Sequence, residues 1–377
     1  MKSQDKEADL PNKDATGRFS AVFPVLEEAV AARAFPGCAF GVLAGGDVVL
    51  SAAVGHFTFE PNAPAARPET AYDIASLTKI VATTAAAMLL VQRGRLDLAT
   101  PLAEVLPDFV AGRVAGDPAR RVTLQHLLAH NSGLPGYEEL FRYANAPAAL
   151  FEACCKLPLE AEPGTRAEYS DPGFILLGRA LEMVMGESLD SFAHREIFLA
   201  LGMSSTGFCP APAVSLAIPP TEEDTTFRHR RIQGEVQDEN AYVLGGVAGH
   251  AGLFSNVADL LRFAKAVLDA RGKEHPAASS LFDVTTVNRF ATRQAPPGSS
   301  QALGWDTPSQ PSSSGTRFSQ HSIGHLGYSG CSIWIDLDAA IAVVLLTNRT
   351  WPDRKSQLIR AVRPAFHDAV RAALDTR

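Results

Sequence analysis

Three features are scarce or missing in this chain: cysteine, an excess of basic residues, and long uncharged apolar segments. Only five of the 377 residues are cysteine, an odd number without zinc-site spacing, which indicates free thiols in a reducing compartment rather than a disulfide framework. The net charge is −7, which excludes the basic surface typical of proteins that bind nucleic acid or anionic membranes. No apolar run resembles a signal sequence or an uncharged membrane span. We therefore expect a cytoplasmic protein that binds a small molecule and neither nucleic acid nor membrane; nothing indicates its oligomeric state.

The length and the order of the secondary-structure patterns predict an α+β protein of two lobes. With 46% hydrophobic and 20% charged residues, the composition is that of a globular protein too long for one simple core. The polar residues 1–18 predict a disordered tail. Strand patterns occur near both chain ends, with helical patterns between them. We expect an antiparallel sheet built from both ends (19–95 and 291–377), flanked by helices, with a mainly helical domain inserted over 96–290.

Hydrophobic periodicity and turn residues place the individual elements. The turn Gly45-Gly46-Asp47 separates two apolar runs and predicts a β-hairpin. The expected strands cover about 38–44, 48–54, 317–323, 331–336 and 340–347. The expected helices cover about 22–30, 77–92, 123–129, 147–155, 172–185, 189–200, 256–269 and 353–374. The helix over 77–92 is apolar nearly all round and should be buried, and the segment 294–316 should be a surface loop.

The strongest local chemical signal is a serine and a lysine three residues apart, Ser76 and Lys79, at the start of the buried helix. Residues three apart share a helix face, so the Lys79 amine can reach the Ser76 hydroxyl. A serine needs an adjacent base, and a lysine is a base only when burial or a nearby cation lowers its pKa. The apolar helix supplies such burial, and its N-terminus presents backbone N–H groups to the reacting oxygen. Alone, however, a Ser-x-x-Lys pair recurs by chance.

Four further motifs strengthen this signal. They are Leu127-Leu128-Ala129-His130-Asn131-Ser132-Gly133-Leu134-Pro135, Tyr169-Ser170-Asp171, Gly245-Gly246-Val247-Ala248-Gly249-His250-Ala251-Gly252-Leu253-Phe254-Ser255 and His325-Leu326-Gly327-Tyr328. With Ser-x-x-Lys they resemble the penicillin-recognising serine enzymes, whose signature is Ser-x-x-Lys, Ser-Asp-Asn and Lys-Thr-Gly. The tyrosine in the middle element resembles class C β-lactamases, DD-peptidases and related esterases. The resemblance covers about residues 20–350.

The resemblance implies a role for each matching residue. Ser76 would attack a carbonyl and form an acyl-enzyme, and Lys79 would accept its proton. Tyr169 would relay protons to the leaving group and help activate the deacylating water. The backbone N–H groups of Ser76 and Tyr328 would form the oxyanion hole, and Gly327 would let substrate approach the strand closely. This chemistry requires neither metal nor cofactor.

Two positions depart from the family pattern. Asp171 stands where the family usually has asparagine, which puts amide recognition in doubt and could add a negative charge near the site. His325 stands where β-lactamases carry a lysine that helps hold the substrate carboxylate, and a histidine does so only when protonated. These departures argue against an efficient β-lactamase more than against a hydrolase.

The remaining candidates are weaker. His126 and His130 have a spacing that suits zinc, but the glutamate of His-Glu-x-x-His is missing, so a helix-end histidine that fixes the next turn is the better interpretation. His250 fits a site-lining position and a hydrogen-bonded loop position equally well. Gly-x-Ser-x-Gly is absent, and its nearest counterpart, around Ser188, lies in helical sequence, which leaves an α/β-hydrolase nucleophile elbow unsupported.

These observations predict an acyl-transferring serine hydrolase. Small esters are the preferred substrates, because of the expected compartment, the two departures, and the reactivity of esters with a Ser–Lys pair. A D-amino-acid peptidase or amidase is the second hypothesis, and a weak β-lactamase is the third. A catalytically silent scaffold is the alternative from another class, and it would fail to react with a fluorophosphonate at Ser76.

Overall fold

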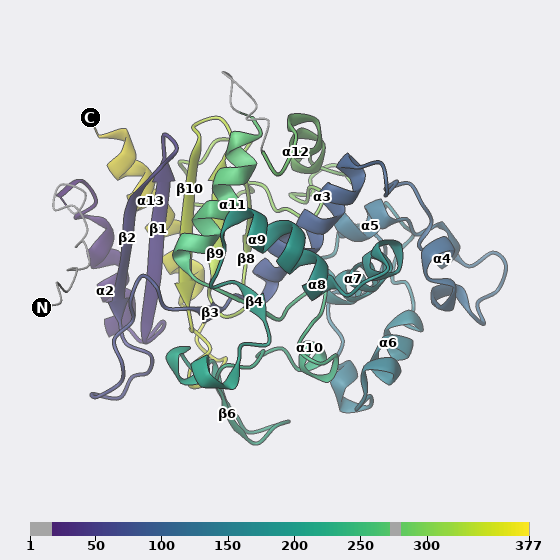
Figure 1. The fold of residues 1–377 in the computed structure, drawn as a ribbon, viewed down its shortest axis with the longest axis horizontal. Helices are drawn as coiled ribbons and strands as arrows, with labels where there is room; N and C mark the ends of the chain where they lie inside the picture. Colours follow the sequence, from purple (N-terminus) through teal and green to yellow (C-terminus); the bar gives the residue numbers. More distant parts are fainter. Residues whose placement is uncertain (1–16, 272–279, 377) are drawn as a thin grey trace, which may run out of the picture.

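The main layer of the protein is a five-stranded antiparallel sheet with the strand order β2-β1-β10-β9-β8 (Figure 1). The structure is a computed structural model that describes residues 17–271 and 280–376. The strands are β1 (Gly37–Ala44), β2 (Asp47–Gly55), β8 (Ile323–Leu326), β9 (Ser332–Asp336) and β10 (Ile341–Thr347). β1 pairs with β10, with Phe40 opposite Leu345. The sheet therefore joins segments from the two ends of the chain, which confirms the predicted fold.

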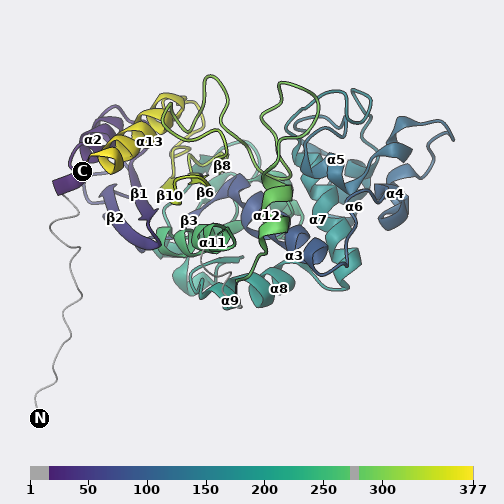
Figure 2. The ribbon, with the colours of Figure 1, turned by 90° about the horizontal axis from the view of Figure 1, so that it is seen from above.

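Helices cover both faces of this sheet (Figure 2). One face carries α2 (Val22–Ala31) and α13 (Ile359–Asp375), whose Phe23 and Phe366 rings contact the Phe40 ring. The other face carries α11 (Val257–Asp269), which lies so close to β1 that a Cβ at Gly41 would be 2.4 Å from the Val257 side chain. Successive side chains of β1 thus enter two different cores, as the alternation of a strand requires.

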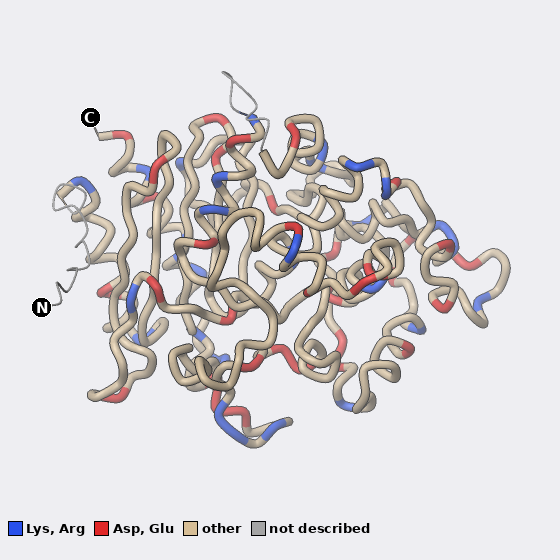
Figure 3. The backbone as a smooth tube through the Cα atoms, in the orientation of Figure 1, with Lys and Arg blue, Asp and Glu red and all other residues tan. Residues whose placement is uncertain are grey.

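The other helices form a second body beside the sheet (Figures 1 and 2). They are α3 (Ala85–Gln92), α4 (Leu102–Val105), α5 (Leu124–Leu128), α6 (Pro147–Cys155), α7 (Asp171–Met185), α8 (Leu189–Ala193), α9 (Leu199–Leu201), α10 (Glu239–Val243) and α12 (Val284–Ala291). A small sheet of β3 (Tyr72–Asp73), β7 (Leu253–Ser255) and β4 (Gly207–Phe208) and the hairpin of β5 (Glu222–Asp224) and β6 (Arg230–Ile232) complete the fold. Acidic and basic residues are interspersed along the described chain (Figure 3).

The central helical run lies in the middle of the protein and changes geometry along its length. It starts as a 3₁₀ turn, η1 (Ala75–Leu77), continues as a π-helix, η2 (Lys79–Thr84), and ends as α3. Ala75–Gln92 has the length and apolarity of a membrane span, but 83% of it is buried inside the protein. π-Helical turns occur frequently at functional sites, and this one begins at Lys79.

Most predicted elements are present, with two informative differences. The strand predicted at 317–323 starts only at Ile323, because the Asp336 carboxylate accepts the Ser319 N–H and holds the preceding residues in a turn. The second difference is α11, which lies inside the segment 96–290 that was expected to form the helical domain, yet packs on the sheet. The division into two domains stays a prediction. The tail 1–18 lies outside the described residues except for Gly17 and Arg18. All five cysteines are free thiols, as predicted.

Candidate active site

Ser76 lies in the strained η1 turn that begins the central helical run, directly after β3. Ala75 has φ of +47°, a left-handed conformation that residues with a Cβ rarely adopt. The buried Asp73 carboxylate holds this turn by accepting the backbone N–H groups of Ala75 at 2.8 Å and Gln237 at 2.7 Å. The half-buried Ser76 is thereby presented to the cleft described below.

Lys79 is fully buried next to Ser76. In a 3₁₀ turn, side chains three residues apart eclipse each other, and Lys79 Nζ donates to Ser76 Oγ at 3.1 Å. Nζ also donates to Asp171 Oδ1 at 2.6 Å and to the His250 carbonyl at 3.1 Å. The structure therefore brings together the predicted nucleophile, its lysine and the aspartate that departs from the family pattern.

The Lys79–Asp171 ion pair changes the expected protonation of the lysine. Burial is the largest single effect and lowers the pKa of Lys79, as the sequence predicted. The charge of Asp171 and its hydrogen bond, together with the contribution of Tyr169, outweigh burial, and the pKa of Lys79 lies above its ordinary 10.5. Lys79 is therefore an ammonium ion at neutral pH. The expectation that burial alone makes Lys79 a free base is wrong for the resting site, because the sequence did not reveal this contact.

Tyr169 lies beside Lys79, just before α7. Its ring centre is 4.8 Å from Lys79 Nζ, and burial raises the pKa of Tyr169, so the phenol keeps its proton at neutral pH. The His130 ring stacks on the Tyr169 ring at 4.6 Å, and His130 Nδ1 accepts the Ser170 N–H at 2.9 Å. His130 thus fixes the segment that carries Tyr169, a contact that motif spacing could not show.

The zinc interpretation of His126 and His130 finds no support in these contacts. His126 Nδ1 accepts the Thr123 N–H at 3.1 Å as part of the cap of α5, whereas His130 Nδ1 is occupied by Ser170. The two rings therefore serve different segments through their Nδ1 atoms, and within the described residues no group of three or more His, Cys, Asp or Glu side chains could hold a metal ion.

His325 lies in β8, one residue before its end, and its ring centre is 5.8 Å from that of Tyr169. Its Nδ1 is 2.8 Å from the Leu326 carbonyl. Burial and the positive charge of Lys79 lower the pKa of His325 to about 3, so the imidazole is neutral near pH 7. His325 consequently cannot supply the positive charge of the lysine that β-lactamases carry at this position.

Gly327 and Tyr328 begin a tight turn after β8 and line the same cleft as Ser76. Within residues 17–271 and 280–376, neither the Ser76 N–H nor the Tyr328 N–H makes a backbone hydrogen bond. Unpaired N–H groups near a nucleophile are suited to bind a developing oxyanion. The predicted oxyanion-hole donors are therefore both available.

We expect Gly327→Ala to lower activity and to destabilise the protein by about 1–3 kcal/mol. A Cβ at Gly327 would lie 2.5 Å from the Ile74 carbonyl oxygen, so the turn would have to move away from the segment that carries Ser76. Urea unfolding and initial hydrolysis rates measure the two effects. Gly116→Ala is the matched control, because nothing lies within 4 Å of its Cβ. Equal rates for Gly327→Ala and wild type would contradict the close approach.

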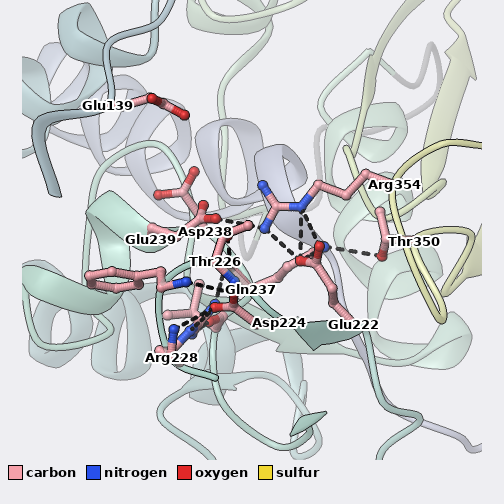
Figure 4. A network of polar contacts seen from close by, with 12 residues as sticks. Glu139, Glu222, Asp224, Thr226, Arg228, Gln237, Asp238, Glu239, Thr350 and Arg354 are labelled. Carbon is pink, nitrogen blue, oxygen red and sulfur yellow. Dashed lines mark hydrogen bonds and ion pairs between the residues drawn. The ribbon is translucent and has the colours of Figure 1, made fainter. Parts of the chain in front are cut away.

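A cleft of about 1060 Å³ opens in front of Ser76, and charged side chains of both signs line it. The acidic ones are Asp73, Glu139, Glu168, Asp171, Asp238, Glu239 and Asp306, and the basic ones are Arg349, Arg354, Arg360 and Arg363. Arg354 is neutralised by ion pairs with Glu222 and Glu239 (Figure 4). For the exposed Arg360, no ion pair is found in the described part of the chain. The cleft thus offers a cation to a negatively charged substrate group.

His250 lies beneath the site rather than along the cleft. Its side chain is buried and its Nε2 is 2.9 Å from Asp238 Oδ1. His250 contributes to the site through its backbone carbonyl, which accepts a hydrogen bond from Lys79 Nζ. Of the two interpretations that the sequence left open, the structure shows the hydrogen-bonded loop position.

Comparisons with known proteins place this geometry in a family. Residues 24–365 match the family model described as Beta-lactamase. The chain is 30% identical over 367 residues to an N-acetylmuramyl-L-alanine amidase of Bacillus subtilis (strain 168), covering 89% of this chain and 82% of that protein. It is 31% identical over 311 residues to a Salmonella agona (strain SL483) protein provisionally named D-alanyl-D-alanine carboxypeptidase, covering 75% and 70%.

Two solved structures illustrate the shared fold. EstCE1, a hydrolase with promiscuous acyltransferase activity, superposes with a TM-score of 0.74 at 20% identity, covering 96% of this chain and 100% of that one. An octameric penicillin-binding protein homologue from Pyrococcus abyssi superposes with a TM-score of 0.70 at 23% identity, covering 95% and 77%. The family match over most of the chain, together with the assembled site, shows that this protein belongs to the β-lactamase family and is a serine hydrolase.

Proposed function

We propose that the protein hydrolyses amide bonds in small, polar acyl compounds that carry a carboxylate, through an acyl-enzyme on Ser76. The observation that carries this proposal is the large charged cleft around Ser76, in which Arg360 stands without an acidic partner in the described chain. An apolar ester would leave these charged groups without a partner, which lowers its binding relative to a charged substrate. The amidase and carboxypeptidase names of the relatives support the same class.

In the proposed reaction, Ser76 Oγ attacks the substrate carbonyl carbon while the N–H groups of Ser76 and Tyr328 bind the carbonyl oxygen. The neutral Tyr169 phenol donates its proton to the leaving amine and recovers one from Lys79. A water molecule then attacks the acyl-enzyme and gives one proton, through the neutral Lys79 amine, to Ser76 Oγ as the Ser76–acyl bond breaks. The carboxylic acid leaves with the other proton of the water. Each group acts from the protonation state that its surroundings impose.

The proton that Ser76 loses requires a second step, because Lys79 is charged in the resting site. We propose that bound substrate excludes water and that Lys79 then passes one proton to Asp171, since an ion pair separated from water loses much of its solvation. Rotation about the Cε–Nζ bond turns the lone pair of the neutral amine toward Ser76 Oγ, 3.1 Å away. In this proposal the base is the Lys79–Asp171 pair rather than the lysine alone.

Hydrolysis of small esters is the second candidate. The neutral His325 favours it, because this position provides no charge for a substrate carboxylate. An alkoxide or phenolate leaving group also depends less on proton donation than an amine does. The scaffold alternative is not supported, because the assembled Ser76, Lys79 and Tyr169 belong to a chain of a hydrolase family.

A substrate panel tests the proposal. We expect an N-acylated D-alanyl-D-alanine peptide to be cleaved, to be cleaved about tenfold less efficiently when its carboxylate is capped as an amide, and not to be cleaved by Ser76→Ala. Release of D-alanine is measured directly, with p-nitrophenyl butyrate and a chromogenic cephalosporin alongside. Turnover of the ester without any amide cleavage would replace the first candidate by the second.

A further inference from the structure

The carbonyl side of the turn after β8 is held by two buried arginines. Arg363 of α13 donates to the carbonyls of Gly327 at 2.6 Å, Cys331 at 2.8 Å and Gly330 at 3.1 Å. Arg349, which follows β10, donates from Nε to the Tyr328 carbonyl at 2.7 Å. The Ser329 carbonyl accepts from the Thr347 hydroxyl and the Arg349 N–H, both at 2.9 Å. Every carbonyl from residue 327 to residue 331 is therefore bound from behind the turn.

Neither guanidinium has a carboxylate partner in the described residues, although both are buried. Arg363 is 7% exposed and Arg349 is 5% exposed, and burial lowers the pKa of Arg363 to about 10, with some repulsion from Arg349. Burying charges without counter-charges is unfavourable, and nearby helix positions carry no acid to relieve it. Two uncompensated cations on one five-residue turn thus indicate that the turn itself requires them.

The bond to Gly327 has a direct consequence for the neighbouring N–H. The Gly327 carbonyl and the Tyr328 N–H belong to one planar trans peptide unit, so they point in opposite directions. Fixing the carbonyl on Arg363 therefore fixes the direction of the Tyr328 N–H. A charged donor on the carbonyl also polarises the peptide unit, which strengthens the N–H as a donor.

We propose that Arg363 is a positioning residue of acyl transfer: it holds the Gly327 carbonyl and thereby aims and polarises the Tyr328 N–H toward the substrate oxyanion. This inference rests on the proposed acyl-enzyme at Ser76. Arg363 acts through the peptide unit and does not itself touch the reacting atoms. Its charge adds a positive potential behind the turn, on the opposite face of the peptide unit from the developing oxyanion.

The test compares Arg363→Lys and Arg363→Met with a control on the same helix, Arg371→Lys. Arg371 is also buried but is paired with Asp336, which ends β9, whereas the turn precedes β9. We expect kcat on p-nitrophenyl butyrate to fall roughly 10–100-fold for both Arg363 variants, with KM within about twofold of wild type. Arg371→Lys should retain the wild-type kcat.

Binding of a boronic acid distinguishes positioning from a structural role, because its tetrahedral adduct with Ser76 places an oxygen in the oxyanion hole. We expect the Kd of phenylboronic acid to rise by the same factor as kcat falls, while thermal unfolding shows a folded protein. If Arg363→Met fails to fold, Arg363→Lys and rescue of Arg363→Ala by ethylguanidinium still decide the question. Unchanged kcat and boronate affinity in folded Arg363→Lys and Arg363→Met, or no rescue, would overturn the proposal.

The two proposals fail in different ways. Wild-type turnover and boronate binding that persist in Ser76→Ala would remove the acyl-enzyme and this inference with it. Turnover and boronate binding that depend on Ser76 but are indifferent to Arg363 would remove only the role of Arg363.

Discussion

Replacing Ser76 with alanine should reduce hydrolysis by about 10⁴-fold or more, because the variant lacks the only atom placed to form the acyl-enzyme. Ser76 Oγ accepts a hydrogen bond from Lys79 and faces the cleft, and Ser76 is the only serine or threonine among the described residues that line the cleft. The measurement is the initial rate on the best substrate of the panel, with circular dichroism to show that the fold is intact.

Covalent labelling tests the assignment of Ser76 as the nucleophile without depending on the choice of substrate. A fluorophosphonate should add one phosphonyl group to the wild type, located on Ser76 by mass spectrometry, and none to Ser76→Ala. Ser188→Ala is the control, because Ser188 lies in the nearest counterpart of a nucleophile elbow but its hydroxyl only contacts Ser191 at the start of α8. Labelling of Ser188, or equal labelling of both variants, would contradict the assignment of Ser76.

Replacing Asp171 with asparagine should move the rising limb of the pH–rate profile to lower pH. In the wild type, Asp171 raises the pKa of Lys79 above 10.5, so the free amine forms only at high pH or by proton transfer to Asp171. Asparagine removes the negative charge and leaves burial, which lowers the pKa of a lysine. The rate of the variant at pH 7, relative to its own plateau, should therefore exceed that of the wild type roughly tenfold or more.

The profile of kcat/KM against pH between 6 and 11 measures this shift, with Asp269→Asn as a control for the same change of charge at an exposed aspartate whose partner is Lys265. The direction in which pH changes the stability of the protein through Lys79 also follows. A pKa raised by folding means that the Lys79 contribution to stability is present below pH 10.5 and is lost as pH rises through the folded-state value. Asp171→Asn should abolish this loss of stability at high pH. If the rising limb of the Asp171→Asn profile lay at the same pH as that of the wild type, Lys79 would not be the group that accepts the proton of Ser76.

Much of the fold follows from local patterns in the sequence. The hairpin of β1 and β2 follows from Gly45-Gly46-Asp47, and α6, predicted at 147–155, is found at Pro147–Cys155. Long amphipathic periods and strong turn residues determine such elements with little help from distant contacts. The central helical run was expected to be a regular α-helix, and its 3₁₀ and π-helical turns were missed, because they depend on the tertiary contacts that fix Ala75 and Lys79.

The candidate site was predictable as a set of residues but not as a set of charges. Motif order identified Ser76, Lys79, Tyr169 and the turn at Gly327, all of which meet in space. The protonation of Lys79 and His325 depends on which groups surround them, and a sequence does not give those distances. Arg349 and Arg363 were missed for the same reason: they belong to no motif, and their partners are backbone carbonyls, which are present at every position.

The pairing of the first sheet strand with the last has a consequence for the synthesis of the protein. β1 pairs with β2 directly after it in the chain, but its other edge pairs with β10, near the C-terminus, and the turn that faces Ser76 is held by a side chain of α13. Both leave the ribosome long after Ser76 does. Ser76 is therefore synthesised early but remains inactive. The five-stranded sheet is incomplete, and the Tyr328 N–H is not held in position, until α13 has been translated. A nascent or prematurely terminated chain should be inert toward acyl compounds, which limits hydrolysis to finished molecules.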